Sequence, residues 1–137
     1  MQWGIFGSNG GEFNNPTGIA VDNSGDIYVC DTNNNRVQKF SKTGDLILKF
    51  GNYGTNDGEF NNPVAIAIDI DKNIFVVDKG NSRIQRFDKD GNFVHKFGSF
   101  GNTNTAFNEP TGILVNEDGY LYITDKNNNA IKVYGRF

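Results

Sequence analysis

The sequence has little of the chemistry that most enzyme sites need. Its 137 residues include one cysteine, Cys30, so no disulfide can form within the chain, and one histidine, His95. A single histidine argues against a histidine metal cluster and against a Ser-His-Asp triad. Cys30 lies in an apolar run, where a cysteine is predicted to be a small core residue rather than a nucleophile. We therefore predict no catalytic residue, no metal site and no cofactor.

Three further absences narrow the range of partners. No run of ~18 apolar residues is present, so we expect no membrane partner. The first residues show no basic region followed by an apolar stretch, so no signal peptide is visible and the sequence indicates no compartment. The net charge is −3, which provides no broad basic surface, and we expect no nucleic-acid partner.

What the sequence does contain is a repeat of 47 residues without a gap. Residues 3–49 and 50–96 are identical at 22 of 47 aligned positions, and prolines and aspartates recur at the same step. The recurring residues are Pro16, Pro63 and Pro110, and Asp31, Asp78 and Asp125. A fixed period of this size is typical of a repeat architecture with one supersecondary unit per repeat.

Each repeat predicts short antiparallel strands and no helix. Apolar or alternating runs are separated by clusters of Asn, Asp and Gly, which tolerate the backbone of tight turns. The predicted strands are 17–21, 27–30, 36–40 and 46–50 in the first repeat, 65–68, 74–77, 83–87 and 93–97 in the second, and 112–115, 121–124 and 130–134 in the third. Four strands in a repeat of ~40–50 residues make a β-propeller blade.

The third repeat lacks its fourth strand, and the start of the chain supplies a segment in register for it. Met1-Gln2-Trp3 aligns with Leu48-Lys49-Phe50 and with His95-Lys96-Phe97. A missing outer strand leaves open sheet edges, which favour association with another chain. We therefore predict that Met1, Gln2 and Trp3 form an assembly strand.

The motifs of the three repeats resemble the NHL-repeat family of β-propellers. The first repeat carries Phe13-Asn-Asn-Pro16, Gly25-Asp-Ile-Tyr-Val-Cys-Asp31 and Asn34-Asn-Arg36-Val-Gln-Lys-Phe40. The second matches through Phe60, Pro63, Asp78, Asn81, Arg83 and Phe87, and the third through Phe107, Pro110, Gly112, Asp125, Asn128 and Tyr134, with Ala130 in place of the arginine. The resemblance covers the whole chain and implies a propeller, which in this family is usually six-bladed.

The predicted fold class is all-β, a propeller of four-stranded antiparallel blades with three blades in a single domain, residues 1–137. The blades are expected at about 17–50, 64–97 and 111–137, the last completed by residues 1–6 of a partner chain. Propellers typically have ~4–8 blades, and three cannot surround an axis without strain. We therefore expect a homodimer that closes a six-bladed ring around a two-fold axis.

The strand order predicts which loops share a face. Strands alternate in direction, so the loop before the first strand and the loop after the second lie at one end of the blade, here named the top face. Their polar side chains are able to hydrogen-bond a protein, peptide or carbohydrate, or only to supply turn conformations. The candidate binding residues are Asn14, Asn15, Asn33, Asn34, Asn61, Asn62, Lys79, Asn81, Asn108, Lys126 and Asn127.

Carboxylates recur in two places where a cation site is the alternative to a structural role. Asp31 and its equivalents end the second strand, and we expect them to cap the following Asn-rich loop and to pair with Arg36 or Arg83. Turns such as 22–26, 69–71 and 88–92 have the spacing of calcium loops but no downstream bidentate Glu. The turn interpretation is therefore favoured over an ion site.

The repeats are too alike to supply the several different groups that one catalytic site needs. The sequence therefore favours a non-catalytic propeller scaffold for protein or ligand interaction, which assembles with a second copy of itself. The resemblance also admits a metal-dependent hydrolase or lyase-like enzyme, and an RNA-binding domain. A third interpretation is that the chain is an excised or engineered half-propeller.

Overall fold

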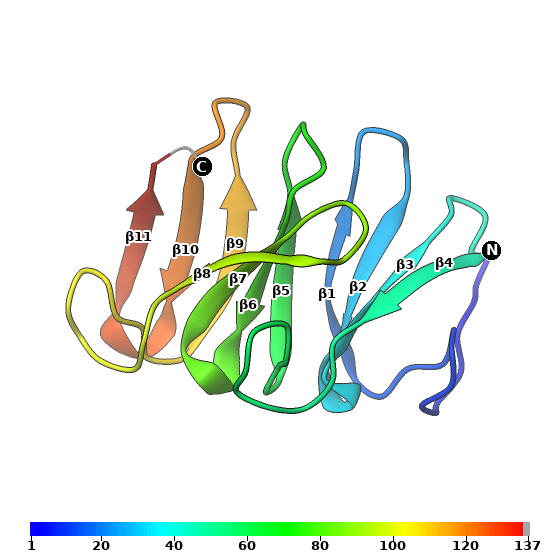
Figure 1. Ribbon diagram of the computed structural model, residues 1–137, viewed down its shortest axis with the longest axis horizontal. Helices are drawn as coiled ribbons and strands as arrows, with labels where there is room; N and C mark the ends of the chain where they lie inside the picture. Colours follow the sequence, from blue (N-terminus) through cyan, green and yellow to red (C-terminus); the bar gives the residue numbers. More distant parts are fainter. Residues whose placement is uncertain (136–137) are drawn as a thin grey trace.

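The computed structural model describes residues 1–135, which form three antiparallel β-sheets side by side in a row (Figure 1). Two of the sheets have four strands and the third has three. In each sheet, strands that follow one another in the sequence are hydrogen-bonded neighbours. The helices within the described residues are single 3-10 turns, and none is long and apolar enough to cross a membrane.

The strands lie where the sequence predicts them, within two residues at each end. Blade 1 consists of β1 (Pro16–Val21), β2 (Ile27–Asp31), η1 (Thr32–Asn34), β3 (Arg36–Phe40) and β4 (Leu46–Phe50). Blade 2 consists of β5 (Pro63–Ile68), β6 (Ile74–Asp78), η2 (Lys79–Asn81), β7 (Arg83–Phe87) and β8 (Phe93–Phe97). Blade 3 consists of β9 (Pro110–Val115), β10 (Leu121–Asp125), η3 (Lys126–Asn128) and β11 (Ala130–Tyr134). The last two residues of the predicted third blade, 136–137, lie outside the described residues.

A proline opens the first strand of every blade, and an irregularity in the ladder accompanies it. In blade 1, Pro16 is opposite Asp31 and Gly18 is opposite Cys30, so the register shifts between them. Proline has no N–H for the ladder and is tolerated at the start of a strand or at a bulge. The repeated proline therefore sets where each first strand leaves its loop.

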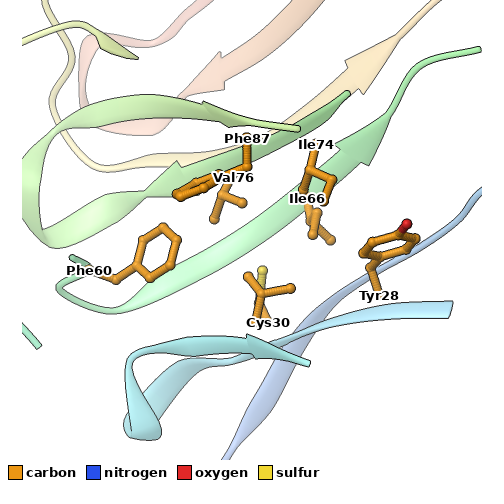
Figure 2. Close-up of a cluster of buried hydrophobic side chains, with 8 residues drawn as sticks. Tyr28, Cys30, Phe60, Ile66, Ile74, Val76 and Phe87 are labelled. Atoms are coloured by element: carbon orange, nitrogen blue, oxygen red, sulfur yellow. The ribbon is translucent and has the colours of Figure 1, made fainter. Parts of the chain in front are cut away.

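The core lies between adjacent sheets. Figure 2 shows Tyr28 and Cys30 of blade 1 facing Ile66, Ile74 and Val76 of blade 2. The residues one repeat later form the second core, in which Phe75, Val77 and Ile84 of blade 2 pack against Phe107, Leu121 and Ile123 of blade 3. Each blade thus has one face for the blade before it and a different face for the blade after it.

The two ends of the row leave one face of each kind uncovered (Figure 1). Ile84 of blade 2 is fully buried by blade 3, while its equivalent in blade 3, Ile131, is 70% exposed. At the other end, Ile66 is 5% exposed and its equivalent in blade 1, Ile19, is 68% exposed. The single chain is therefore an open arc of three blades with two unmatched apolar faces.

Candidate functional site

The predicted top face is present. In every blade a backbone hydrogen bond joins the 3-10 turn after the second strand to the loop before the first strand. These bonds run from Asn33 N–H to the carbonyl of Asn14, from Gly80 N–H to that of Asn61, and from Asn127 N–H to that of Asn108, at 2.7–3.0 Å. The two sets of loops therefore lie on one surface, as the strand directions predict.

A buried aspartate fixes this surface to each blade. Asp31 Oδ1 accepts the N–H of Asn14 at 2.8 Å, and its Oδ2 accepts Arg36 Nε at 2.7 Å. Asn34 and Gln38 also donate to Oδ2, at 3.0 and 3.2 Å. Because all four of these partners are hydrogen-bond donors, the carboxylate is satisfied by protein groups and has a structural role.

The expected partner of Asp31 was half correct. The pairing with Arg36, and that of Asp78 with Arg83, is confirmed. The cap of the following loop is wrong, because η1 has no side-chain cap bond. The loop before β1 closes over the end of β2, so the nearest N–H group belongs to Asn14 and not to the Asn-rich turn.

The arginine ties down the rest of the top loop. Arg36 Nη1 donates to the carbonyl of Ser8, and Nη2 donates to the carbonyls of Asn9 and Glu12, at 2.8–3.0 Å. Arg83 makes the same set of contacts one repeat later. A planar guanidinium with several donors is well suited to collect carbonyls from a turn in this way.

Blade 3 reaches the same result with a different residue. Ala130 takes the place of the arginine, and Lys132, at the position of Gln38 and Gln85, extends to Asp125 Oδ2 at 2.8 Å. Its ammonium also donates to the carbonyls of Thr103 and Ala106. Burial acts to raise the pKa of Asp125, but the hydrogen bonds from Lys132 and the Asn108 N–H outweigh it and hold the pKa below its usual value.

The predicted binding residues divide into used and available groups. The side-chain amides of Asn34 and Asn81 donate to the carbonyls of Gly7 and Gly54 and to the buried aspartates, so they hold loops. Asn15 and Asn62 adopt left-handed backbone, with φ of 57° and 54°, which supports the turn interpretation for their backbone. Asn14 pairs with Asn33, and Asn108 pairs with Asn127, through side-chain amides at 3.2 Å. Lys79 and Lys126 both approach Glu109. Ligand binding by the available residues, Asn61 among them, stays a prediction.

The carboxylates of the opposite, bottom turns fold back on their own backbone. Oδ1 of Asp22, Asp69 and Asp88 each accepts the N–H groups two and four residues later, at 2.8–3.1 Å. Burial acts to raise the pKa of Asp22, but the N–H groups of Ser24 and Asp26 and the Tyr28 hydroxyl lower it overall. The same turn N–H groups lower the pKa of Asp88. The turn interpretation of these segments is therefore confirmed.

Three exposed aromatic side chains on the top loops are absent from the predicted site. Phe6 is 81% exposed, Tyr53 is 69% exposed and Phe100 is 76% exposed. They stand 47 residues apart, each directly before a glycine. That spacing was the available signal, but the sequence does not distinguish them from the aromatic residues at Phe13 and its equivalents, which pack inward.

The free face of blade 1 forms a groove of about 580 Å³. It is lined by Met1, Gln2, Trp3, Phe13, Pro16, Thr17, Gly18, Ile19 and Val29. Trp3 packs on Phe40 with ring centroids 6.0 Å apart, as Phe50 packs on Phe87 at 4.9 Å and Phe97 packs on Tyr134 at 4.5 Å. The predicted assembly strand thus carries an aromatic residue in the place that the last strand of the preceding blade takes elsewhere.

Comparison with family models agrees with this repeat geometry. A model described as "NHL repeat" matches residues 13–40, and one described as "6-bladed beta-propeller" matches residues 69–136. The chain carries an NHL repeat and is similar to six-bladed β-propellers. The first match contains Asn14, Asp31 and Arg36, whose hydrogen bonds connect the loop before β1 to blade 1.

Curated relatives match a single NHL-repeat segment of this chain. It is 51% identical over 43 residues to B-box type zinc finger protein ncl-1 of Caenorhabditis elegans, and 45% identical over 49 residues to Protein brain tumor of Drosophila melanogaster. These alignments cover 31% and 36% of this chain. The chain spans about 5% of the length of either relative.

Solved structures share the fold of this chain at low sequence identity. Hydrazine synthase of Kuenenia stuttgartiensis has a TM-score of 0.70 and 16% identity, over 88% of this chain and 32% of that one. A streptogramin B lyase has a TM-score of 0.62 and 21% identity, over 88% of this chain and 40% of that one. At these identities the likeness shows the fold alone.

Proposed function

We propose that this NHL-type chain is a non-catalytic interaction scaffold that closes a six-bladed ring with a second copy of itself. The observation that carries the proposal is the pair of unmatched blade faces at the ends of the arc. A contiguous patch of exposed apolar side chains on the surface of a protein marks an association site. Two copies related by a two-fold axis would cover all four free faces at once.

The two free faces have the residue types that the internal junctions already join. Tyr122, Thr124 and Ile131 of blade 3 stand where Phe75, Val77 and Ile84 of blade 2 contact the next blade. On blade 1, Phe13, Ile19 and Val29 stand where Phe60, Ile66 and Val76 receive the preceding blade. The closing junction would therefore repeat a packing that this chain makes twice within itself.

The N-terminal segment supports the same arrangement. A Cβ at Gly44 would lie 3.1 Å from the Trp3 ring, and a Cβ at Gly91 would lie 2.8 Å from the Phe50 ring. Trp3 thus occupies the place of the aromatic residue at the end of β4. In the ring, residues 1–3 would pair with β11 of the partner as the fourth strand of its blade 3 and would cover an open sheet edge.

The state of the reactive side chains supports a non-catalytic role. Burial raises the pKa of the Cys30 thiol well above its usual range, and the side chain is fully buried, so the nucleophilic thiolate is disfavoured. The repeated aspartates are consumed in loop anchoring. The surface left for function is the top face, for which we propose a protein, peptide or carbohydrate ligand.

Sedimentation equilibrium at micromolar concentration tests the ring. We expect a mass of twice 15.2 kDa for the parent chain. Ile131→Asp places a charge in the closing junction and should give a folded monomer, while Val94→Asp, at a 48% exposed position of the outer strand β8, should leave the dimer intact. Removing residues 1–3 should weaken the dimer. A folded monomeric parent would overturn the ring, and metal-dependent turnover in an esterase and lactonase screen would overturn the non-catalytic role.

A further inference from the structure

The junction between blades 2 and 3 carries a polar hollow on the top face, here named the 2–3 niche. It has a volume of about 330 Å³. Its main lining residues are Asn62, Lys79, Ser82, Phe100, Glu109 and Asn127. Both walls come from one chain, so the niche exists whether or not two copies close a ring.

One departure from the repeat opens this junction. At the junction of blades 1 and 2, Asn35 Oδ1 accepts the N–H of Asn62 at 2.9 Å and bridges the gap. At the next junction Ser82 stands in place of Asn35, and no such bond to the N–H of Glu109 is present among residues 1–135. The shorter Ser82 side chain leaves space where the other junction is bridged.

The groups around the space combine one apolar face with donors and acceptors of both charges. The Phe100 ring is 76% exposed and forms the apolar wall. Glu109 Oε2 lies 4.0 Å from Lys79 Nζ and 3.6 Å from Lys126 Nζ, and all three side chains are partly or largely exposed. Ion pairs this exposed are weak, so a ligand can take over their contacts at little cost.

This combination discriminates between ligand classes. A polyanion is disfavoured because a carboxylate lies between the two ammonium groups. A purely apolar ligand would leave the amides and charged groups without partners. A neutral ring with hydroxyl groups around its rim and C–H groups on its faces satisfies both the aromatic wall and the polar rim.

We propose that the 2–3 niche binds a neutral saccharide. A sugar ring would lie with its C–H face on Phe100, and its hydroxyls would donate to Glu109 and accept from Lys79 and the Asn127 amide. The inference rests on the scaffold part of the proposed function and names the ligand class of its top face. In the closed ring two such niches would be present on one surface, which would strengthen binding to a repeating glycan by avidity.

Saturation-transfer NMR with a panel of glucose, galactose, mannose, N-acetylglucosamine and cellobiose tests the niche. We expect transfer to the C–H protons of at least one sugar, and binding about tenfold or more weaker in Phe100→Ala, since an aromatic contact is worth roughly a factor of ten. Glu109→Gln keeps the shape and should also weaken binding. Tyr53→Ala removes a 69% exposed aromatic residue at the same repeat position and should leave binding unchanged.

The outcomes separate the niche from the ring. Binding retained by the monomeric Ile131→Asp variant would support the niche even where ring closure fails. No transfer from any sugar at millimolar concentration would overturn the proposal, as would equal binding by the parent and a folded Phe100→Ala variant. Binding of unstructured peptides at this niche in place of sugars would also overturn it.

Discussion

Replacing Arg83 by alanine perturbs the most densely bonded group of the top face. The side chain is 6% exposed, and its Nε donates to Asp78 Oδ2 at 2.6 Å. Its two Nη groups donate to the carbonyls of Thr55, Asn56 and Glu59 at 2.8–2.9 Å. The substitution therefore removes one buried ion pair and three charge-assisted hydrogen bonds from a single loop.

The magnitude follows from what remains around Asp78. Removing one partner of a buried ion pair costs ~3–5 kcal/mol, because an uncompensated charge stays buried. Asp78 would still accept from the Asn61 N–H, Asn81 and Gln85, and these three donors favour the lower end of that range. We expect a loss of about 3 kcal/mol in the free energy of unfolding, a large part of the ~5–15 kcal/mol typical of a domain.

Blade 3 indicates a second substitution that should restore the stability lost in Arg83→Ala. Because Ala130 and Lys132 do there what Arg83 and Gln85 do in blade 2, the double variant Arg83→Ala/Gln85→Lys should recover at least half of the loss. Urea unfolding at one fixed protein concentration measures both. Lys96→Ala removes an exposed ion pair with Asp57 and should cost less than ~1 kcal/mol. A loss of less than about 1 kcal/mol for Arg83→Ala, or a double variant no more stable than the single one, would refute the reasoning.

Two further predictions concern backbone and pH. Gly51→Ala should destabilise the fold by roughly 2–4 kcal/mol, because φ is 99° and a Cβ would lie 2.5 Å from the Phe60 ring. Gly11→Ala, where φ is 82° and the space is open, should cost only the ~1–2 kcal/mol of the backbone strain. Equal thermal midpoints for the two variants would contradict this. The Asp125 carboxylate has a folded pKa below its usual value, so its stabilisation is fully present above the ordinary carboxyl pKa and is lost as the pH falls through the folded pKa. Asp125→Asn should therefore be less stable than the parent at pH 7, and a stability gap that does not narrow in acid would count against a stabilising Lys132 contact.

The strands were predictable because turn residues and apolar runs recur at one period, and an error in one repeat is corrected by the other two. The pairing of Asp31 with Arg36 was also predictable, since opposite charges stand at adjacent ends of paired strands. The donor from Asn14 was not, because it depends on how a separate loop closes over the blade. The use of Lys132 in place of an arginine in blade 3 was not predictable either, because it depends on positions 85 and 132 pointing at equivalent carboxylates, Asp78 and Asp125.

The 2–3 niche was also not predictable from the sequence. From the sequence Ser82 is an ordinary turn residue, and only the bridge that Asn35 makes at the neighbouring junction shows which contact is missing. The repeats are thus internal controls for one another, but only after their side chains are placed in space.

The free face of blade 3 also differs from its equivalents in blades 1 and 2, and the difference bears on ring closure. Lys39 of blade 1 pairs with Asp26 at 3.2 Å, and Arg86 of blade 2 donates to Asn73 at 3.0 Å. In blade 3 the equivalent of these cations is Val133, and the equivalent of Asp26 and Asn73 is Tyr120. Val133 is 56% exposed in the single chain, whereas Lys39, at the equivalent position of a covered junction, is 9% exposed. Loss of the cation together with its partner yields an uncharged, apolar junction, which is the surface expected if another blade, and not water, covers it.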